Sequence, residues 1–275
     1  MMAKGNKAGE YLQAGDLEKA LGALTEQIRS DPSKVELRIF IFQLLGVLGR
    51  WDRAMTQLNV AAEMDSDVAL MAQVYRNALN CEVLRASVFK GRRSPLIFGE
   101  PLEWMAWLIQ VPGLICAGEL KAAADMRDKA FDASPIVSGQ IDGQAFEWIA
   151  DADVRLGPTL EAIVNGKYYW IPFEHIQRIQ IEEPVNLRDV IWVPATFTWT
   201  NQGQAMGMIP SRYPGSENEE DSAFQMGRKT DWLDLGHDFF IGIGQRMLAT
   251  DQGEYPLLEI REVILDHPGS QQESG

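Results

Sequence analysis

The sequence is poor in cysteine, with Cys81 and Cys116 as the only two among 275 residues. Both lie in apolar stretches that resemble helices. Two separated thiols supply neither the disulfide framework of a small secreted domain nor the close ligand spacing of a structural zinc site. We therefore expect two reduced, buried thiols.

Positive charge is also scarce. The chain has 25 Lys and Arg residues against 39 Asp and Glu residues, which leaves a net charge of -14. Such a chain repels polyanions and anionic lipid headgroups, so we expect neither nucleic acid nor membrane as a partner. Lys90, Arg92 and Arg93 form a local basic turn, which we interpret as a solvated loop, with an anion site as the alternative.

No long hydrophobic run is present. The first fifteen residues lack the apolar segment of a signal peptide, and the most apolar later stretch is interrupted at Gln110, Pro112 and Gly113, well short of a bilayer span. We expect a cytoplasmic protein. The 46% apolar and 23% charged content is that of a folded globular chain with a substantial core.

Catalytic motifs are missing as well. His175, His237 and His267 lie far apart in the sequence, and the chain has no zinc-protease helix motif, nucleophile elbow or phosphate-binding loop. We expect a protein that is not an enzyme and that holds no metal and no cofactor.

The densest carboxylate group is Glu147, Asp151 and Asp153, beside Trp148. We interpret these residues as helix-end caps, with Asp151 pairing with Arg155 four residues later. The alternative is an acid/base or metal site, and hence an enzyme housed in this part of the chain.

The N-terminal half contains an internal repeat. Residues 15–32 and 49–66 are similar at an offset of 34 residues, and a third copy at 118–135 follows the second by 69 residues. A 34-residue period of helix, turn and helix is typical of tetratricopeptide repeats. The matched residues of the first two copies are Gly15, Ala20 and Leu24 with Gly49, Ala54 and Leu58.

The repeat is degenerate in its middle. Residues 68–89 read as one long helix, and residues 91–101 as a loop with two prolines. Helical repeat arrays offer concave binding surfaces and rarely carry active sites of their own. This architecture favours a binding protein.

The C-terminal half changes to short alternating segments. Residues 160–164 and 167–173 flank Asn165-Gly166 and predict a hairpin with a type I′ turn. A further strand is predicted at 190–200, bulged or at a sheet edge because of Pro194, and the acidic residues 217–221 are interpreted as a mobile surface loop.

The predicted fold class is therefore α+β. We expect degenerate tetratricopeptide-like helical repeats over residues 1–140, followed by a small, β-rich, barrel-like domain over residues 141–275.

Six longer strings resemble one known family, the ImpE/TagJ or SciE-type proteins. They are FGEPLEW (98–104), EWIADADVRLGP (147–158), NGKYYWIPFEHI (165–176), LRDVIWVPA (187–195), IPSRYPGSE (209–217) and GQRMLATDQGEYPLLEIREV (244–263). The resemblance implies a non-enzymatic adaptor of the bacterial type VI secretion system. It further implies binding of the N-terminal helix of the small sheath subunit, and modulation of sheath handling by the ClpV-type unfoldase.

A bound helix needs an apolar groove that receives anchors at helical spacing. The predicted anchors are Trp104, Trp107, Trp148, Tyr168, Tyr169 and Trp170, with Arg92 and Arg93 as rim charges. Alternation along the hairpin places Tyr168 and Trp170 on one face and Tyr169 on the other, so one face belongs to the core. A general tetratricopeptide cochaperone or scaffold is the alternative, although the inner helices carry few basic residues for clamping a peptide tail.

Overall fold

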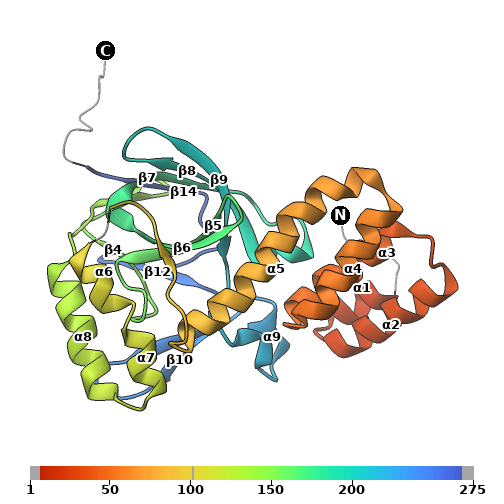
Figure 1. The fold of residues 1–275 in the computed structure, drawn as a ribbon, viewed down its shortest axis with the longest axis horizontal. Coiled ribbons are helices and arrows are strands. Elements are labelled where there is room, and N and C mark those ends of the chain that lie inside the picture. The colour runs from red at the N-terminus through yellow and green to blue at the C-terminus, as the bar shows by residue number, and fades with distance from the viewer. Residues whose placement is uncertain (1–6, 101, 268–275) are drawn as a thin grey trace.

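The computed structural model describes residues 7–100 and 102–267. Helices gather at one end, and a large sheet with its own helices occupies the other (Figure 1). This arrangement confirms the α+β class. The N-terminal helices are α1 (Lys7–Gln13), α2 (Leu17–Ser30), α3 (Val35–Val47), α4 (Trp51–Met64) and α5 (Ala69–Phe89).

Glycines at positive φ separate the first two helix pairs. Gly15 has φ of 80° before α2 and Gly49 has φ of 65° before α4, a conformation that L side chains rarely adopt. Leu24 and Leu58, matched at the 34-residue offset, are both fully buried. Residues related by the 34-residue offset therefore occupy equivalent buried positions in α2 and α4. The assignment to tetratricopeptide repeats stays a prediction.

The third sequence copy lies away from the first two. Helices α6 (Glu103–Leu108), α7 (Val111–Cys116) and α8 (Leu120–Ala133) pack together on the opposite side of the molecule from α1 to α4 (Figure 1). The long α5 connects the two helical groups. It is one continuous helix, as predicted for residues 68–89. The copies therefore do not stack into one continuous array, and none of the described helices is long and apolar enough to cross a bilayer.

The main sheet has nine strands in the order β1-β6-β5-β9-β8-β7-β14-β2-β3. Its edge strands β1 and β3 do not pair with each other in the described chain, so the sheet is open and the predicted barrel is wrong. The strands are β1 (Leu96–Ile97), β2 (Gly139–Ile141), β3 (Gln144–Phe146), β5 (Thr159–Val164), β6 (Lys167–Pro172), β7 (Ile176–Ile181), β8 (Trp192–Trp199), β9 (Gln204–Pro210) and β14 (Glu262–Leu265).

Two small sheets complete the C-terminal part. One pairs β10 (Thr230–Asp234) with β11 (Phe240–Gly244), and the other joins β4 (Ile149–Asp151), β12 (Met247–Thr250) and β13 (Gly253–Pro256). Short helical turns lie between the strands, and two of them, η4 (Ser216–Asn218) and α9 (Ser222–Gln225), face the N-terminal helices.

The hairpin of β5 and β6 is confirmed. Val164 pairs with Lys167 across the turn, and Asn165 and Gly166 have φ of 50° and 72°, as a type I′ turn requires. Strand β8, in contrast, is neither an edge nor bulged at Pro194, because Pro194 pairs in register with Met208 of β9 and its carbonyl accepts from the Glu182 N–H on the β7 side at 3.0 Å. Its missing N–H therefore removes only the second bond of the pair with Glu182, where the pairing with β7 runs out.

The sheet separates two hydrophobic clusters. On one face Ile163, Tyr168 and Trp192 belong to the cluster that includes the helices. On the other face Phe197 belongs to a second cluster, formed by residues of the C-terminal part. Helix α5 runs across the helical face (Figure 1). Cys81 on α5 is buried, whereas Cys116 is exposed, contrary to the prediction.

Replacing Gly166 by Ala is expected to destabilise the fold by more than the about 1–2 kcal/mol that a left-handed alanine costs. A Cβ on Gly166 would lie 2.6 Å from Asn77 Nδ2 of α5. Gly143→Ala is the control, because Gly143 also has a positive φ but nothing within 4 Å of an added Cβ. Urea denaturation measures both, and equal losses would contradict the contact with α5.

Candidate functional site

The centre of the molecule is a buried carboxylate, Glu161, in the middle of β5. It accepts hydrogen bonds from Arg85 of α5, with Nε at 2.7 Å and Nη2 at 2.9 Å, and also from Tyr168 and Arg246. Burial alone would raise the pKa of Glu161, but the two guanidinium groups outweigh it and lower the pKa to about 2. Glu161 is therefore held as an anion.

A second buried carboxylate, Asp151, shares Arg246 with Glu161. Asp151 also accepts from the Tyr213 hydroxyl at 3.2 Å and from the Asp153 N–H at 2.9 Å. Burial raises the pKa of Asp151 to about 6 even though Arg246 lies beside it. One arginine thus serves two buried acids of different pKa.

The same network reaches the N-terminal helices. Glu82 of α5 accepts from the Trp192 indole at 2.9 Å, and burial raises the pKa of Glu82. Arg212 donates to the Val47 carbonyl of α3 at 2.9 Å, and burial lowers the pKa of Arg212 to about 10. Buried polar contacts therefore join α3 and α5 to the sheet and to the chain that follows β9.

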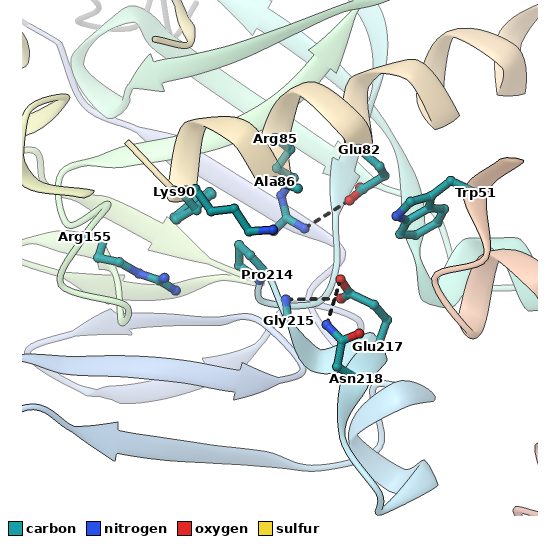
Figure 2. A pocket seen from close by; sticks show the side chains of 11 residues that line it. Trp51, Glu82, Arg85, Ala86, Lys90, Arg155, Pro214, Gly215, Glu217 and Asn218 are labelled. Carbon is teal, nitrogen blue, oxygen red and sulfur yellow. Dashed lines mark hydrogen bonds and ion pairs between the residues drawn. The ribbon is translucent and has the colours of Figure 1, made fainter. Parts of the chain in front are cut away.

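A pocket opens where these parts meet, and we call it the junction pocket (Figure 2). Its volume is about 220 Å³. It lies between α5, the start of α4, the turn after β4 and the loop at 214–218. The lining residues are Trp51, Glu82, Arg85, Ala86, Phe89, Lys90, Arg155, Pro214, Gly215, Glu217 and Asn218.

Glu217 and Asn218, from the acidic run at 217–221, line this pocket. The run was predicted as a mobile loop, but it folds into η4 and the approach to α9. Glu217 accepts from the Gly215 N–H at 3.1 Å, and Gln225 donates to the Glu217 and Glu219 carbonyls. These hydrogen bonds join residues that are close in the chain, and Asn218, Glu220 and Asp221 remain exposed.

The carboxylates near Trp148 occupy β4 and a turn, so the predicted helix end is wrong. Asp153 rather than Asp151 pairs with Arg155, which donates from Nε at 2.9 Å and from Nη2 at 2.5 Å. Glu147 is exposed. Within residues 7–100 and 102–267, no group of three or more His, Cys, Asp or Glu side chains is arranged to hold a metal ion.

Three of the predicted anchors lie in the core. Trp104 is 5% exposed, Tyr168 1% and Trp170 0%. The Trp104 indole donates to Glu174 at 3.2 Å, and the Trp170 indole donates to the Tyr168 hydroxyl at 2.7 Å. These side chains already have apolar and polar partners inside the chain, so they offer no surface to another protein.

The other predicted anchors keep exposed surface but belong to separate elements. Trp148 is 40% exposed. Trp107 is half-buried beneath Lys129, whose Nζ lies 3.7 Å from the ring centre, and Tyr169 is half-buried on the face of β6 opposite to Tyr168, as alternation predicts. The structure does not gather them into one aromatic groove.

Arg92 and Arg93 lie in the exposed turn after α5. They line a shallow hollow beside Ile109, Leu114 and Met126, at the packed helices α6 to α8. This position agrees with a solvated basic turn next to an apolar surface.

The network residues Arg85, Glu161 and Arg246 were missed by sequence reasoning. A signal was present, because Glu161 is a single charge inside the apolar segment LEAIV. A charge in the middle of a strand that is buried on both faces requires a buried partner. The sequence offers no means of choosing among 25 basic residues for that partner.

Replacing Arg246 by Met is expected to lower the free energy of unfolding by about 3–5 kcal/mol, because it leaves buried Asp151 without a cation and leaves Glu161 with Arg85 alone. Arg178→Met is the control, since Arg178 pairs with Glu262 at the surface, where a lost ion pair costs about 1 kcal/mol or less. Guanidinium denaturation compares them. Similar losses would show that the buried network contributes no more to the free energy of unfolding than a surface ion pair does.

Asp151 is expected to make stability fall as pH rises from about 4 to 6. Its pKa is about 6 in the folded state against 3.8 unfolded, so the folded protein binds the extra proton in this window and loses that advantage above it. The loss amounts to as much as about 3 kcal/mol. Denaturation at several pH values should show a flatter profile for Asp151→Asn, whereas exposed Asp125→Asn should keep the wild-type slope.

Comparison with known proteins agrees with the resemblance seen in the sequence. The sequence model of the ImpE protein family matches residues 143–264. The chain is 47% identical over 256 residues to the type VI secretion system accessory component TagJ of Pseudomonas aeruginosa, which covers 93% of this chain and 90% of that protein.

A solved structure has the same fold. The crystal structure of protein VPA1032 from Vibrio parahaemolyticus superposes with a TM-score of 0.88, covering 97% of this chain and 100% of that one at 21% identity. Because the likeness to TagJ runs along nearly the whole chain at high identity, this protein belongs to the ImpE/TagJ family.

Proposed function

We propose that this protein is a non-enzymatic, cytoplasmic accessory adaptor of a bacterial type VI secretion system. The observation that carries the proposal is the 47% identity, over 93% of the chain, to a relative named as an accessory component of that system. The finer role follows the family resemblance. The adaptor binds the N-terminal helix of the small sheath subunit and thereby modulates sheath handling by the ClpV-type unfoldase.

One surface has the properties that an amphipathic helix requires. We call it the α4–α5 corner, and its apolar residues are Met64, Leu70 and Val74, which are 37%, 79% and 43% exposed. Leu70 and Val74 are four residues apart on α5, so they lie on one face of the helix. A partner helix that packs beside α5 would bury this face.

Acidic side chains border the corner. Glu63 lies in the last turn of α4, and Asp65 and Asp67 lie between α4 and α5. An apolar centre with an acidic rim suits a helix that carries apolar anchors and basic neighbours. The net charge of -14 would also speed the encounter with a basic segment.

Isothermal titration with a synthetic peptide of the cognate subunit's N-terminal helix tests the proposal, with a scrambled peptide as control. We expect saturable binding of the native peptide only. The double variant Leu70→Ser with Val74→Ser should weaken it about tenfold or more, because central apolar contacts dominate such interfaces. Ile136→Ser is the matched variant, since Ile136 is 82% exposed on another part of the surface.

The same peptide titration with Trp107→Ala and with Trp148→Ala tests whether the interface lies at these predicted anchors instead of at the α4–α5 corner. A loss confined to either tryptophan variant would move the groove to the predicted anchors, and no binding at all would reject the sheath-helix role. For the unfoldase, the rate of disassembly of purified sheaths is measured with and without this protein. An unchanged rate would reject modulation.

A further inference from the structure

The junction pocket directs unused hydrogen-bond donors into one space. Arg155 binds Asp153 through Nε and Nη2, which leaves Nη1 without a partner among the described residues. The Lys90 ammonium group likewise has no hydrogen bond or ion pair in residues 7–100 and 102–267. Arg85 uses Nε and Nη2 for Glu161 and the Arg212 carbonyl, and its Nη1 has only a 3.4 Å contact with Glu82.

Two of these cations, Arg85 and Lys90, come from α5 and its end, and Arg155 comes from the turn after β4 (Figure 2). Figure 2 shows the Lys90 and Arg155 side chains pointing toward the region of Arg85 and Pro214. Arg85 is 5% exposed and Arg155 7% exposed, so both guanidinium groups are nearly buried. Each guanidinium group is neutralised by its own buried carboxylate, so what Arg85 and Arg155 offer a ligand is N–H donors, and the exposed Lys90 adds a positive charge.

The remaining lining limits the charge of the anion. Arg85 and Arg155 are already paired with Glu161 and Asp153, and Glu82 and Glu217 also line the pocket, so Lys90 is the lining cation that has no ion pair among the described residues. A group with a single negative charge matches this balance, while a dianion such as phosphate would face excess repulsion. Guanidinium N–H groups also match the planar geometry of a carboxylate.

The apolar walls suit a short carbon chain attached to that group. Phe89 lies beneath the Arg155 guanidinium at 4.6 Å from the ring centre, and Trp51 and Pro214 add further apolar surface. The volume of about 220 Å³ admits a small acid or one acidic side chain rather than a large ligand.

We propose that the junction pocket binds a single carboxylate through Arg85, Lys90 and Arg155. This site is separate from the α4–α5 corner and does not depend on helix binding there. The carboxylate belongs either to a free small acid or to an acidic side chain of a protein partner, and both present the same chemistry to the pocket.

Sodium propionate, which has the length of an acidic side chain, is the probe. Isothermal titration at constant ionic strength should show saturable binding to the full chain, with inorganic phosphate weaker and methylammonium inactive. Lys90→Gln should raise the Kd about tenfold, because it removes a charge-assisted hydrogen bond. Arg93→Gln is the matched control, since it removes one charge from the same turn but lies outside the pocket.

Glu217→Gln is expected to lower the Kd for propionate, because it removes a competing negative charge and keeps an oxygen that accepts from the Gly215 N–H. A purely structural role of Lys90 and Glu217 would not produce opposite changes. Absence of saturable propionate binding, equal effects of Lys90→Gln and Arg93→Gln, or binding of methylammonium instead would each overturn the proposal.

The source of the carboxylate is distinguished on protein purified in carboxylate-free buffer. Heat denaturation followed by mass spectrometry of the supernatant should release a stoichiometric small acid if the ligand is free. A pocket that releases none but binds propionate assigns the group to a protein partner. Either outcome agrees with a carboxylate site, and each leads to a different search for the natural ligand.

Discussion

The fold depends on one buried carboxylate, Glu161, and the two arginines that neutralise it. An ionised carboxylate away from water is unfavourable by several kcal/mol unless cations and hydrogen bonds replace the lost solvent. Arg85 comes from α5 and Arg246 from the chain before β12. Neither half of the protein can satisfy Glu161 alone, so the long helix and the sheet have to assemble together. The helical half and the β-rich half are therefore energetically coupled.

The same coupling creates the junction pocket. Arg85 is oriented by Glu161 and Arg155 by Asp153, and both guanidinium groups use only part of their donors for these buried acids. The unused N–H groups face the space where α5, η4 and the turn after β4 meet. A structural ion-pair network thus prepares a recognition site at its border. The matched family region, residues 143–264, contains Glu161, Asp153 and Arg246, whereas Arg85 lies outside it. The pocket needs both parts of the chain.

Most of the aromatic side chains predicted as binding anchors do not lie on the surface that we propose for helix binding. Several tryptophans and tyrosines that look like anchors in the sequence form the core between helices and sheet instead. The surface with apolar residues at helical spacing lies on α5, where aliphatic side chains with acidic neighbours replace the aromatic ones. An adaptor that binds through such a surface would rely on aliphatic packing and charge, and its aromatic residues would hold the scaffold rigid.

Local patterns in the sequence determined the α+β class, the long helix α5, the 34-residue correspondence of α2 and α4, the turn at Asn165-Gly166 and the family. Each depends on residues near one another in the chain or on whole strings of them. The open sheet, the separation of the third helical copy and the pairing of Glu161 with Arg85 and Arg246 were decided only by tertiary structure. Residues 76 and 85 positions away from Glu161 supply these contacts. Which of many charged side chains meet in a low-dielectric interior depends on how distant elements pack, and that has no local signature.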